Sequence, residues 1–251
     1  TTGTQNTAVG SYALEANSTG NQVTAVGFRA LDQNTTAHNN TAMGHSALGA
    51  NTTGGQNTAV GAYALDANTT ADANTAFGYN ALTNNTTGQL NTAVGMEALE
   101  TMATGSSNTA VGYHALNSSS NCQQCTAVGR YALGANTTGS ENTAVGRLAG
   151  QTTTTGSNNL SLGYNATSPS ATSSNNVNLG DGNIGALRCA QTSITSLSDE
   201  RDKTEIIDLP IGLDFINLLK PRKFKWATRE GCNRDGKYEA GFIAQEFQAI
   251  E

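Results

Sequence analysis

The chain has 251 residues and a net charge of −6, and only 13% of its residues are charged and 6% aromatic. Globular domains usually carry about 25% charged residues, whereas Thr, Asn and Gly make up more than a third of this chain. This composition disfavours an ordinary enzyme core rich in Leu, Ile and Phe. The acidic balance gives no reason to expect nucleic-acid binding. No apolar run of about 18 residues predicts a membrane span.

The distribution of charge divides the chain near residue 190. Residues 1–190 hold 12 charged residues and no Lys, whereas residues 191–251 hold 20 charged residues in 61 positions. The only tryptophan, Trp226, also lies in the second part. Two segments of different physical character are therefore joined in one chain.

The first segment is built from a 17-residue repeat. One unit reads approximately N-T-A-V-G-x-x-A-L-x-x-N-T-T-G-x-x, and no insertion interrupts the spacing. Self-similarity at a fixed period is the sequence signature of a solenoid. The NTAVG glycine recurs at Gly10, Gly27, Gly44, Gly61, Gly78, Gly95, Gly112, Gly129, Gly146, Gly163 and Gly180.

Each unit is too short for a pair of helices, because helical repeats need about 33 residues or more. The TAVG and xAL islands are each as long as a short strand, and the residues between them favour turns. We therefore predict a mostly β chain in which residues 1–180 form a β-solenoid of eleven coils with two short strands per coil. We expect the Val and Ala-Leu positions to face inward, and Asn and Thr to form outer hydrogen-bonded ladders.

So thin a coil buries few apolar side chains. Solenoids of this kind usually gain stability by packing against copies of themselves, so the repeat itself favours an oligomer.

Sequons of the type Asn-x-Thr or Asn-x-Ser recur along the repeat. They can accept glycans in a secreted protein, but Asn-Thr-Thr-Gly is also a turn sequence. We interpret these motifs as turns. They begin at Asn17, Asn34, Asn51, Asn68, Asn85 and Asn136.

Cysteine and histidine give no prediction of a metal site. Cys122 and Cys125 form a CQQC motif in which Cys125 takes an Asn position of the repeat, and a zinc site would need further ligands at suitable spacing. We expect a local variation of the repeat, with a disulfide as the alternative. The three histidines, His38, His45 and His114, occupy variable positions of the repeat. We expect no cofactor and no metal.

Residues 181–197 read as a connector, and residues 198–251 follow a different pattern. An apolar helical face over 211–219 ends at Lys220-Pro221, residues 223–226 and 238–243 alternate as two strands, and a helix begins at Ala244. This predicts a small α+β unit. About 60 residues is marginal for an independent core, so we expect the unit to be cut short at Glu251 or completed by partners.

Three motifs in this segment carry a family resemblance. The run SDERDK, then GLDFINLLKPRKFKW, then GFIAQEFQ resembles the C-terminal intramolecular chaperone and self-cleaving peptidase of bacteriophage tail fibres and tailspikes. The NTAVG repeats look like those that commonly precede such a domain. More distantly, they resemble the left-handed β-roll heads of trimeric autotransporter adhesins.

The resemblance implies a homotrimer whose C-terminal domain guides assembly and then cuts itself off. It also implies a Ser-Lys dyad, with Ser198 as the nucleophile, Lys203 as the base and the Leu197–Ser198 bond as the one cleaved. Asp202 departs from the family pattern, because an apolar or basic residue is expected there.

The proposed chemistry is consistent with the residues present. A Ser hydroxyl is a weak nucleophile that needs an adjacent base, and Lys serves as the base when burial lowers its pKa. No histidine follows residue 114. Attack by Ser198 on the carbonyl of Leu197 is intramolecular, so proximity supplies much of the rate.

Two function classes compete. The first is a structural and host-interaction fibre of a virion, which binds a glycan or protein receptor on the host cell. The second is a bacterial surface or secreted trimeric adhesin built on the same rod. An enzyme that acts on an external glycan is disfavoured, because the repeats do not pair carboxylates as a glycosidase needs. The resemblance of residues 198–251 favours the phage fibre.

Overall fold

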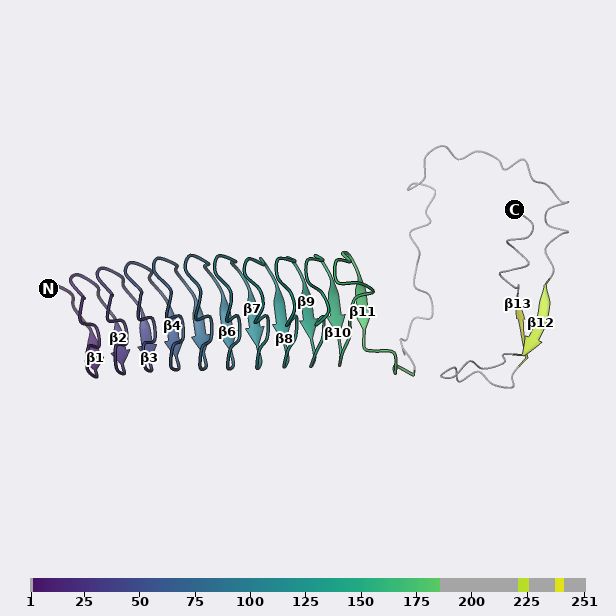
Figure 1. The fold of residues 1–251 in the computed structure, drawn as a ribbon, viewed down its shortest axis with the longest axis horizontal. Coiled ribbons are helices and arrows are strands. Elements are labelled where there is room, and N and C mark those ends of the chain that lie inside the picture. The colour runs from purple at the N-terminus through teal and green to yellow at the C-terminus, as the bar shows by residue number, and fades with distance from the viewer. Residues whose placement is uncertain (1, 186–220, 226–237, 242–251) are drawn as a thin grey trace, which may run out of the picture. The chain divides into compact units, whose positions relative to one another are not determined.

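The computed structural model describes residues 2–185, 221–225 and 238–241, and it separates the chain into two units, Thr1–Gly182 and Asn183–Glu251. The first unit is a β-solenoid in which each coil contributes one short strand (Figure 1). The strands are β1 (Thr7–Val9), β2 (Thr24–Val26), β3 (Thr41–Met43), β4 (Thr58–Val60), β5 (Thr75–Phe77), β6 (Thr92–Val94), β7 (Thr109–Val111), β8 (Thr126–Val128), β9 (Thr143–Val145), β10 (Leu160–Leu162) and β11 (Val177–Leu179). Among the described residues, no helix is long or apolar enough to cross a membrane.

The eleven strands form one parallel sheet in chain order, and each strand pairs with the equivalent strand of the next repeat unit. Thr7 lies opposite Thr24, and Ala8 lies opposite Ala25. Identical residues therefore stack coil upon coil, with strands about 4.8 Å apart, so the sheet extends about 50 Å along the solenoid. This confirms the predicted β-solenoid and its 17-residue period.

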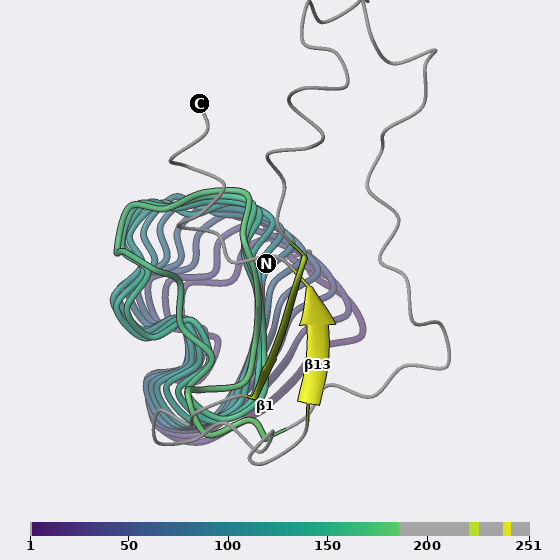
Figure 2. The ribbon, with the colours of Figure 1, turned by 90° about the vertical axis from the view of Figure 1, so that its right-hand side faces the viewer.

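The strands turn a small residue inward and a large one outward. Ala25, the middle residue of β2, is fully buried, whereas Val9 and Phe77, the last residues of β1 and β5, are 58% and 55% exposed. Successive side chains of a strand point to opposite faces, so the first and third residues of each triplet share the outer face. The prediction that the Val position faces inward was wrong, because the narrow interior accommodates Ala at this level. In the view along the solenoid, the strands line one flat side of the coil (Figure 2).

The Ala-Leu segment faces the core as predicted, but it is a turn and not a second strand. Leu65 is fully buried and has a φ of 52°, and Tyr63, two positions earlier, has a φ of 59°. The same pair of positive φ values recurs in successive coils. These left-handed residues turn the chain and close each coil within a single repeat unit.

A Leu in the left-handed region costs about 1 kcal/mol or more. Burial of its side chain offsets this cost, since a fully buried Leu contributes about 1.5–3 kcal/mol. The backbone is also paired there, because the Leu65 N–H donates to the Ala81 carbonyl of the next coil at 3.1 Å.

The glycine that ends the NTAVG motif has a steric role. Gly78 has a φ of 145°, and a Cβ atom placed on it would lie 2.5 Å from the carbonyl oxygen of Gly95 in the next coil. Both the backbone conformation and the close approach of neighbouring coils therefore require glycine at this position.

Asparagine lines the interior, so the predicted outer ladder of Asn was wrong. In the first buried column, Asn40 Nδ2 donates to the Gly54 carbonyl at 2.8 Å, and its Oδ1 accepts from the Asn57 N–H at 2.8 Å. Backbone groups buried away from water must find partners. The turns leave such groups inside the coil, and the Asn amides satisfy them.

A second column is formed by the sequon asparagines. Asn68 Nδ2 donates to the Ala71 carbonyl at 3.1 Å and to Asn51 Oδ1 at 2.8 Å. Five of these side chains are fully buried, and Asn17 is 9% exposed. The acceptor amides of the sequons therefore lie inside the folded coils, in agreement with their interpretation as turns. The threonines that follow them bond outward-facing carbonyls, as in the 3.0 Å bond from Thr52 Oγ1 to the Thr69 carbonyl.

The second column is broken at Met102 and Ser119 and ends after Asn136, and the Asn before each gap has an unpaired acceptor. Within the described residues, the buried side-chain atoms without a hydrogen-bond partner are Asn85 Oδ1 and Asn136 Oδ1. The next coil has Met102 above the first and Thr153 above the second, where the column would otherwise supply an Asn amide. An unsatisfied buried acceptor costs about 1–3 kcal/mol.

The second unit contains a strand pair. β12 (Arg222–Lys225) and β13 (Tyr238–Gly241) are antiparallel, with Arg222 opposite Gly241 and Lys225 opposite Tyr238. This confirms the two predicted strands in part of their predicted ranges. The helices predicted over 211–219 and from Ala244 lie outside the described residues.

Restoring the second Asn column should stabilise the solenoid. The substitution Thr153→Asn places an amide donor next to Asn136 Oδ1, and we expect a gain of about 1 kcal/mol in the free energy of unfolding. Chemical denaturation at a fixed protein concentration measures this gain. Thr152→Asn is the matched control, because Thr152 is exposed on the same turn. Equal effects of the two substitutions would contradict this account of the column.

Candidate functional sites

The outer face of the solenoid carries a continuous apolar row, which we call the outer stripe. Every strand contributes its third residue to it. Eight of these eleven side chains are at least 36% exposed, and the other three are partly buried. The stripe consists of Val9, Val26, Met43, Val60, Phe77, Val94, Val111, Val128, Val145, Leu162 and Leu179.

Aromatic side chains form a second, interrupted row, shortly after the stripe in most coils. Phe28 stacks on His45 with ring centroids 5.2 Å apart, and His45 lies 5.0 Å from Tyr63. Farther along, Arg130 lies over the rings of Tyr113 and Tyr131 at 5.6 and 5.0 Å from their centroids. The contacts that join neighbouring coils, such as Phe28 with His45 and Arg130 with Tyr113, each add about 0.5–1.5 kcal/mol.

An exposed apolar row of this length is unusual for a monomer. Large exposed apolar patches mark surfaces that bind other proteins. The stripe extends along all eleven strands, about 50 Å, and its composition hardly changes from coil to coil. Its side chains recur at the spacing of the strands, about 4.8 Å.

The predicted cleavage site lies outside the described residues. It comprises the dyad Ser198 and Lys203 and the bond between Leu197 and Ser198. Their geometry therefore adds nothing to the sequence-based hypothesis. Asp202, the departure from the family pattern, lies in the same part of the chain.

Comparison with protein families identifies the end of the chain. Residues 198–251 match the family model Peptidase S74, described as the chaperone of endosialidase. The match covers the same residues that carry the resemblance in the sequence. Neither a curated protein nor a solved structure matches the chain. The chaperone segment begins one short connector after β11, the last strand of the solenoid.

The two cysteines of the CQQC motif are buried free thiols that replace other residues of the coil. Cys125 Sγ donates to the Gly139 carbonyl at 3.3 Å, the kind of acceptor that an Asn amide bonds in other coils. Cys122 Sγ donates to Asn108 Oδ1 at 3.3 Å. Contact between the thiols raises the pKa of Cys122 and lowers the pKa of Cys125. The motif is a local variation of the repeat, as predicted, and the alternative of a disulfide is not formed.

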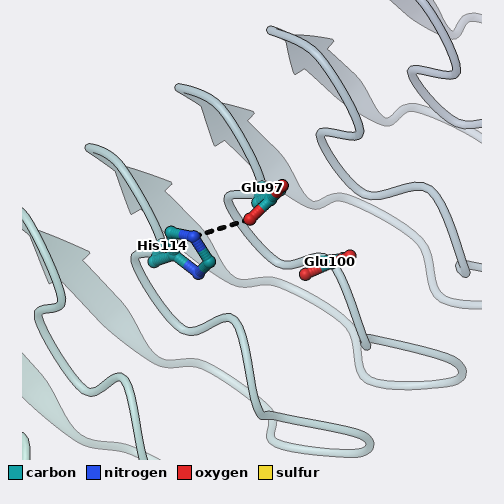
Figure 3. Close-up of side chains that lie close together, drawn as sticks. All are labelled: Glu97, Glu100 and His114. Carbon is teal, nitrogen blue, oxygen red and sulfur yellow. Dashed lines mark ion pairs between the residues drawn. The ribbon is translucent and has the colours of Figure 1, made fainter.

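One cluster in the described residues has the composition of a metal site. Glu97, Glu100 and His114 each place one ligand atom within 4.8 Å of the others, and all three are partly buried (Figure 3). The cluster was not predicted from the sequence, because no single histidine indicates it. Aligning the units would have revealed it, since Glu97 and His114 occupy the same position of consecutive units and therefore stack.

A pair of carboxylates lies on either side of Gly49. A Cβ atom on Gly49 would lie 2.6 Å from Asp66 Oδ1 and 3.7 Å from Asp32 Oδ1. Asp32 accepts a 2.9 Å hydrogen bond from Arg29 Nε. Burial, and then the negative charge of Asp32, raise the pKa of the Asp66 carboxyl above its usual value of 3.8.

The raised pKa of Asp66 predicts a specific pH dependence. The folded state binds the proton more tightly than the unfolded state, so this contribution to stability is complete below pH 3.8 and is lost as pH rises through the folded pKa. Asp66→Asn should therefore be more stable than the parent at pH 7, and the difference should vanish below pH 3.8. Thermal midpoints across this range measure it. Glu141→Gln, which removes an exposed carboxylate, is the control. A difference that grows at acidic pH would contradict the assignment.

Proposed function

We propose that the chain is the shaft and assembly domain of a homotrimeric fibre of the phage tail-fibre or tailspike type. The observation that carries this proposal is the chaperone-of-endosialidase segment at 198–251, which follows an uninterrupted solenoid of eleven coils. The solenoid supplies a stiff rod, and the chaperone segment supplies the means of assembling it.

The outer stripe supports self-association of the rods. Three copies placed in parallel can face their stripes toward a common axis and remove apolar surface from water, at about 25 cal/mol per Å². The thin coil gives the single chain few other large side chains to bury.

The trimer contact can be tested with a charge in the stripe. In the rod of residues 1–197 that remains after cleavage, Phe77→Asp should shift the mass from that of three chains toward that of one, because burying an unpaired carboxylate is costly. Multi-angle light scattering measures the mass.

Thr87→Asp is the matched control, because it adds the same charge at an exposed turn after β5. Circular dichroism of each variant checks that the solenoid remains folded. A trimer that tolerates Phe77→Asp as well as Thr87→Asp would exclude the stripe as the contact.

In the proposed maturation step, Ser198 attacks the carbonyl carbon of Leu197. Lys203 takes the proton of the Ser198 hydroxyl and passes it to the leaving amine, which is the amino group of Ser198 itself. The peptide bond becomes an ester between Leu197 and the Ser198 side chain, and water then hydrolyses this ester. Ser-Lys pairs are a recognised variant of the Ser-His-Asp arrangement.

Self-cleavage predicts one cut without any added protease. The purified chain should yield residues 1–197 and a second fragment whose first residue is Ser198, as measured by intact mass and N-terminal sequencing. Ser198→Ala and Lys203→Ala should each leave the chain uncut but still trimeric, since assembly precedes cleavage. Ser196→Ala is the matched control and should cleave normally. Persistent cleavage in Ser198→Ala would show that another group is the nucleophile.

The fibre would attach the virion to a glycan or protein on the host surface. The alternative, a bacterial trimeric adhesin, shares the rod but is less consistent with a chaperone segment of the endosialidase type at its end. A binding assay of the mature rod on intact bacterial cells, with the Phe77→Asp variant as a comparison, tests the attachment role.

A further inference from the structure

We propose that Glu97, Glu100 and His114 form a site for a divalent transition-metal ion, Zn²⁺ above all, that links two consecutive coils of the solenoid. Glu97 and Glu100 follow β6 on one coil, and His114 follows β7 on the next. Figure 3 shows the His114 ring facing Glu97, with Glu100 beside them. The three ligand atoms lie within 4.8 Å of one another.

The stacking of coils creates this site. Glu97 and His114 occupy the same position of consecutive units, and both have a positive φ, 57° and 53°. In other coils this position holds residues such as Tyr63 and Tyr131, which cannot be combined with a neighbour into a set of metal ligands. The site therefore belongs to this one pair of coils.

The imidazole is held in place by its neighbours. Its Nε2 lies 2.6 Å from Glu97 Oε2, its Nδ1 lies 2.8 Å from Asn117 Nδ2, and its ring stacks on Tyr131 with centroids 5.2 Å apart. Contacts of this kind, made to the ligands and not to the ion, orient the ligands of metal sites. The side chains of His114 and Glu97 are 16% and 20% exposed, so the site is shielded but open to an entering ion.

Metal binding needs only local rearrangement. In the arrangement described, Asn117 Nδ2 donates to Nδ1, so Nε2 carries the proton that is shared with Glu97. Zinc would take the place of that proton on Nε2. The tautomer with the proton on Nδ1 then donates to Asn117 once its amide turns to present Oδ1, an exchange that Asn permits because it carries both a donor and an acceptor.

The charge and the ligand types favour zinc. Two carboxylates and one imidazole provide up to two negative charges for a divalent cation. The cationic side chain on the following coil, Arg130, lies over the rings of Tyr113 and Tyr131. An imidazole ligand suits Zn²⁺ and its neighbours in the transition series, whereas Mg²⁺ and Ca²⁺ prefer oxygen ligands alone. Zinc binds such groups at about 2.0–2.2 Å. Rotation of the two Glu side chains would bring their oxygens within reach of the ion, and water would complete the coordination.

The test is titration of the full chain with zinc chloride, followed by isothermal titration calorimetry and by thermal denaturation. We expect one Zn²⁺ per chain and a thermal midpoint that rises with zinc concentration, because a ligand that binds only the folded state stabilises it. Excess Mg²⁺ should not displace the zinc. Cobalt(II) bound at the site should give visible d–d bands without a thiolate charge-transfer band.

Three variants assign the site. His114→Gln should weaken zinc binding by about 100-fold or more, Glu100→Gln by at least about 10-fold, and Asn117→Ala by about 10- to 100-fold through loss of ring orientation. His45→Gln is the matched control, because His45 also contacts aromatic rings of neighbouring coils but belongs to no group of metal-ligand atoms among the described residues.

All variants keep the cysteines, so binding by thiols would survive His114→Gln. The proposal would be overturned if the parent chain did not bind zinc or if His114→Gln bound it as tightly as the parent. A thiolate band in the cobalt spectrum would also overturn it. Thermal midpoints of the variants without metal show whether each one folds as the parent does.

Discussion

Stacking of identical residues at a fixed 17-residue offset is the constraint on which the whole solenoid depends. Each coil is closed by hydrogen bonds to its neighbours, as in the Leu65 N–H bond to Ala81, and not by a core of its own. The interior is so narrow that a typical coil buries two Ala, one Leu and two Asn. The two Asn columns make this possible, because they pair the backbone groups that a chain of turns leaves inside.

The same stacking sets the rules for charge. A carboxylate repeated in neighbouring coils would lie about 4.8 Å from the next one. Even across the intervening Gly49, the charge of Asp32 adds to the effect of burial in raising the pKa of Asp66. The stacking can equally bring unlike groups together, as it does with Glu97 and His114. The stacking of equivalent positions therefore explains both why charged residues are scarce in the repeat and why reactive side chains occur at a few variable positions.

The sequence was sufficient for the period, the parallel register and the buried Ala-Leu positions, because these follow from the spacing alone. It did not determine which face of the TAV triplet is inside. Hydrophobicity favours Val, but the narrow coil selects by volume and takes Ala. The sequence also did not indicate the turn at Leu65. A Leu rarely adopts a left-handed backbone conformation, and this one is stable only once the Leu side chains of successive coils stack. Ser198 and Lys203 were predicted from the family resemblance. The Glu97–His114 contact can be predicted only when the repeat units are aligned with one another.

In the proposed fibre, the regular outer stripe and the non-repeating C-terminal segment would solve different parts of one assembly problem. The stripe is uniform along eleven strands, so sliding one copy by a whole coil still leaves ten of eleven positions matched and costs few contacts. The stripe can therefore bring copies together without fixing their register, as happens wherever a repeat pairs with itself. Register has to come from a segment that lacks the repeat, and the chaperone segment at 198–251 is such a segment. Once the copies are aligned, removing that segment would leave a rod that cannot easily find its register again after unfolding. Its persistence would then rest on the barrier to unfolding rather than on equilibrium stability.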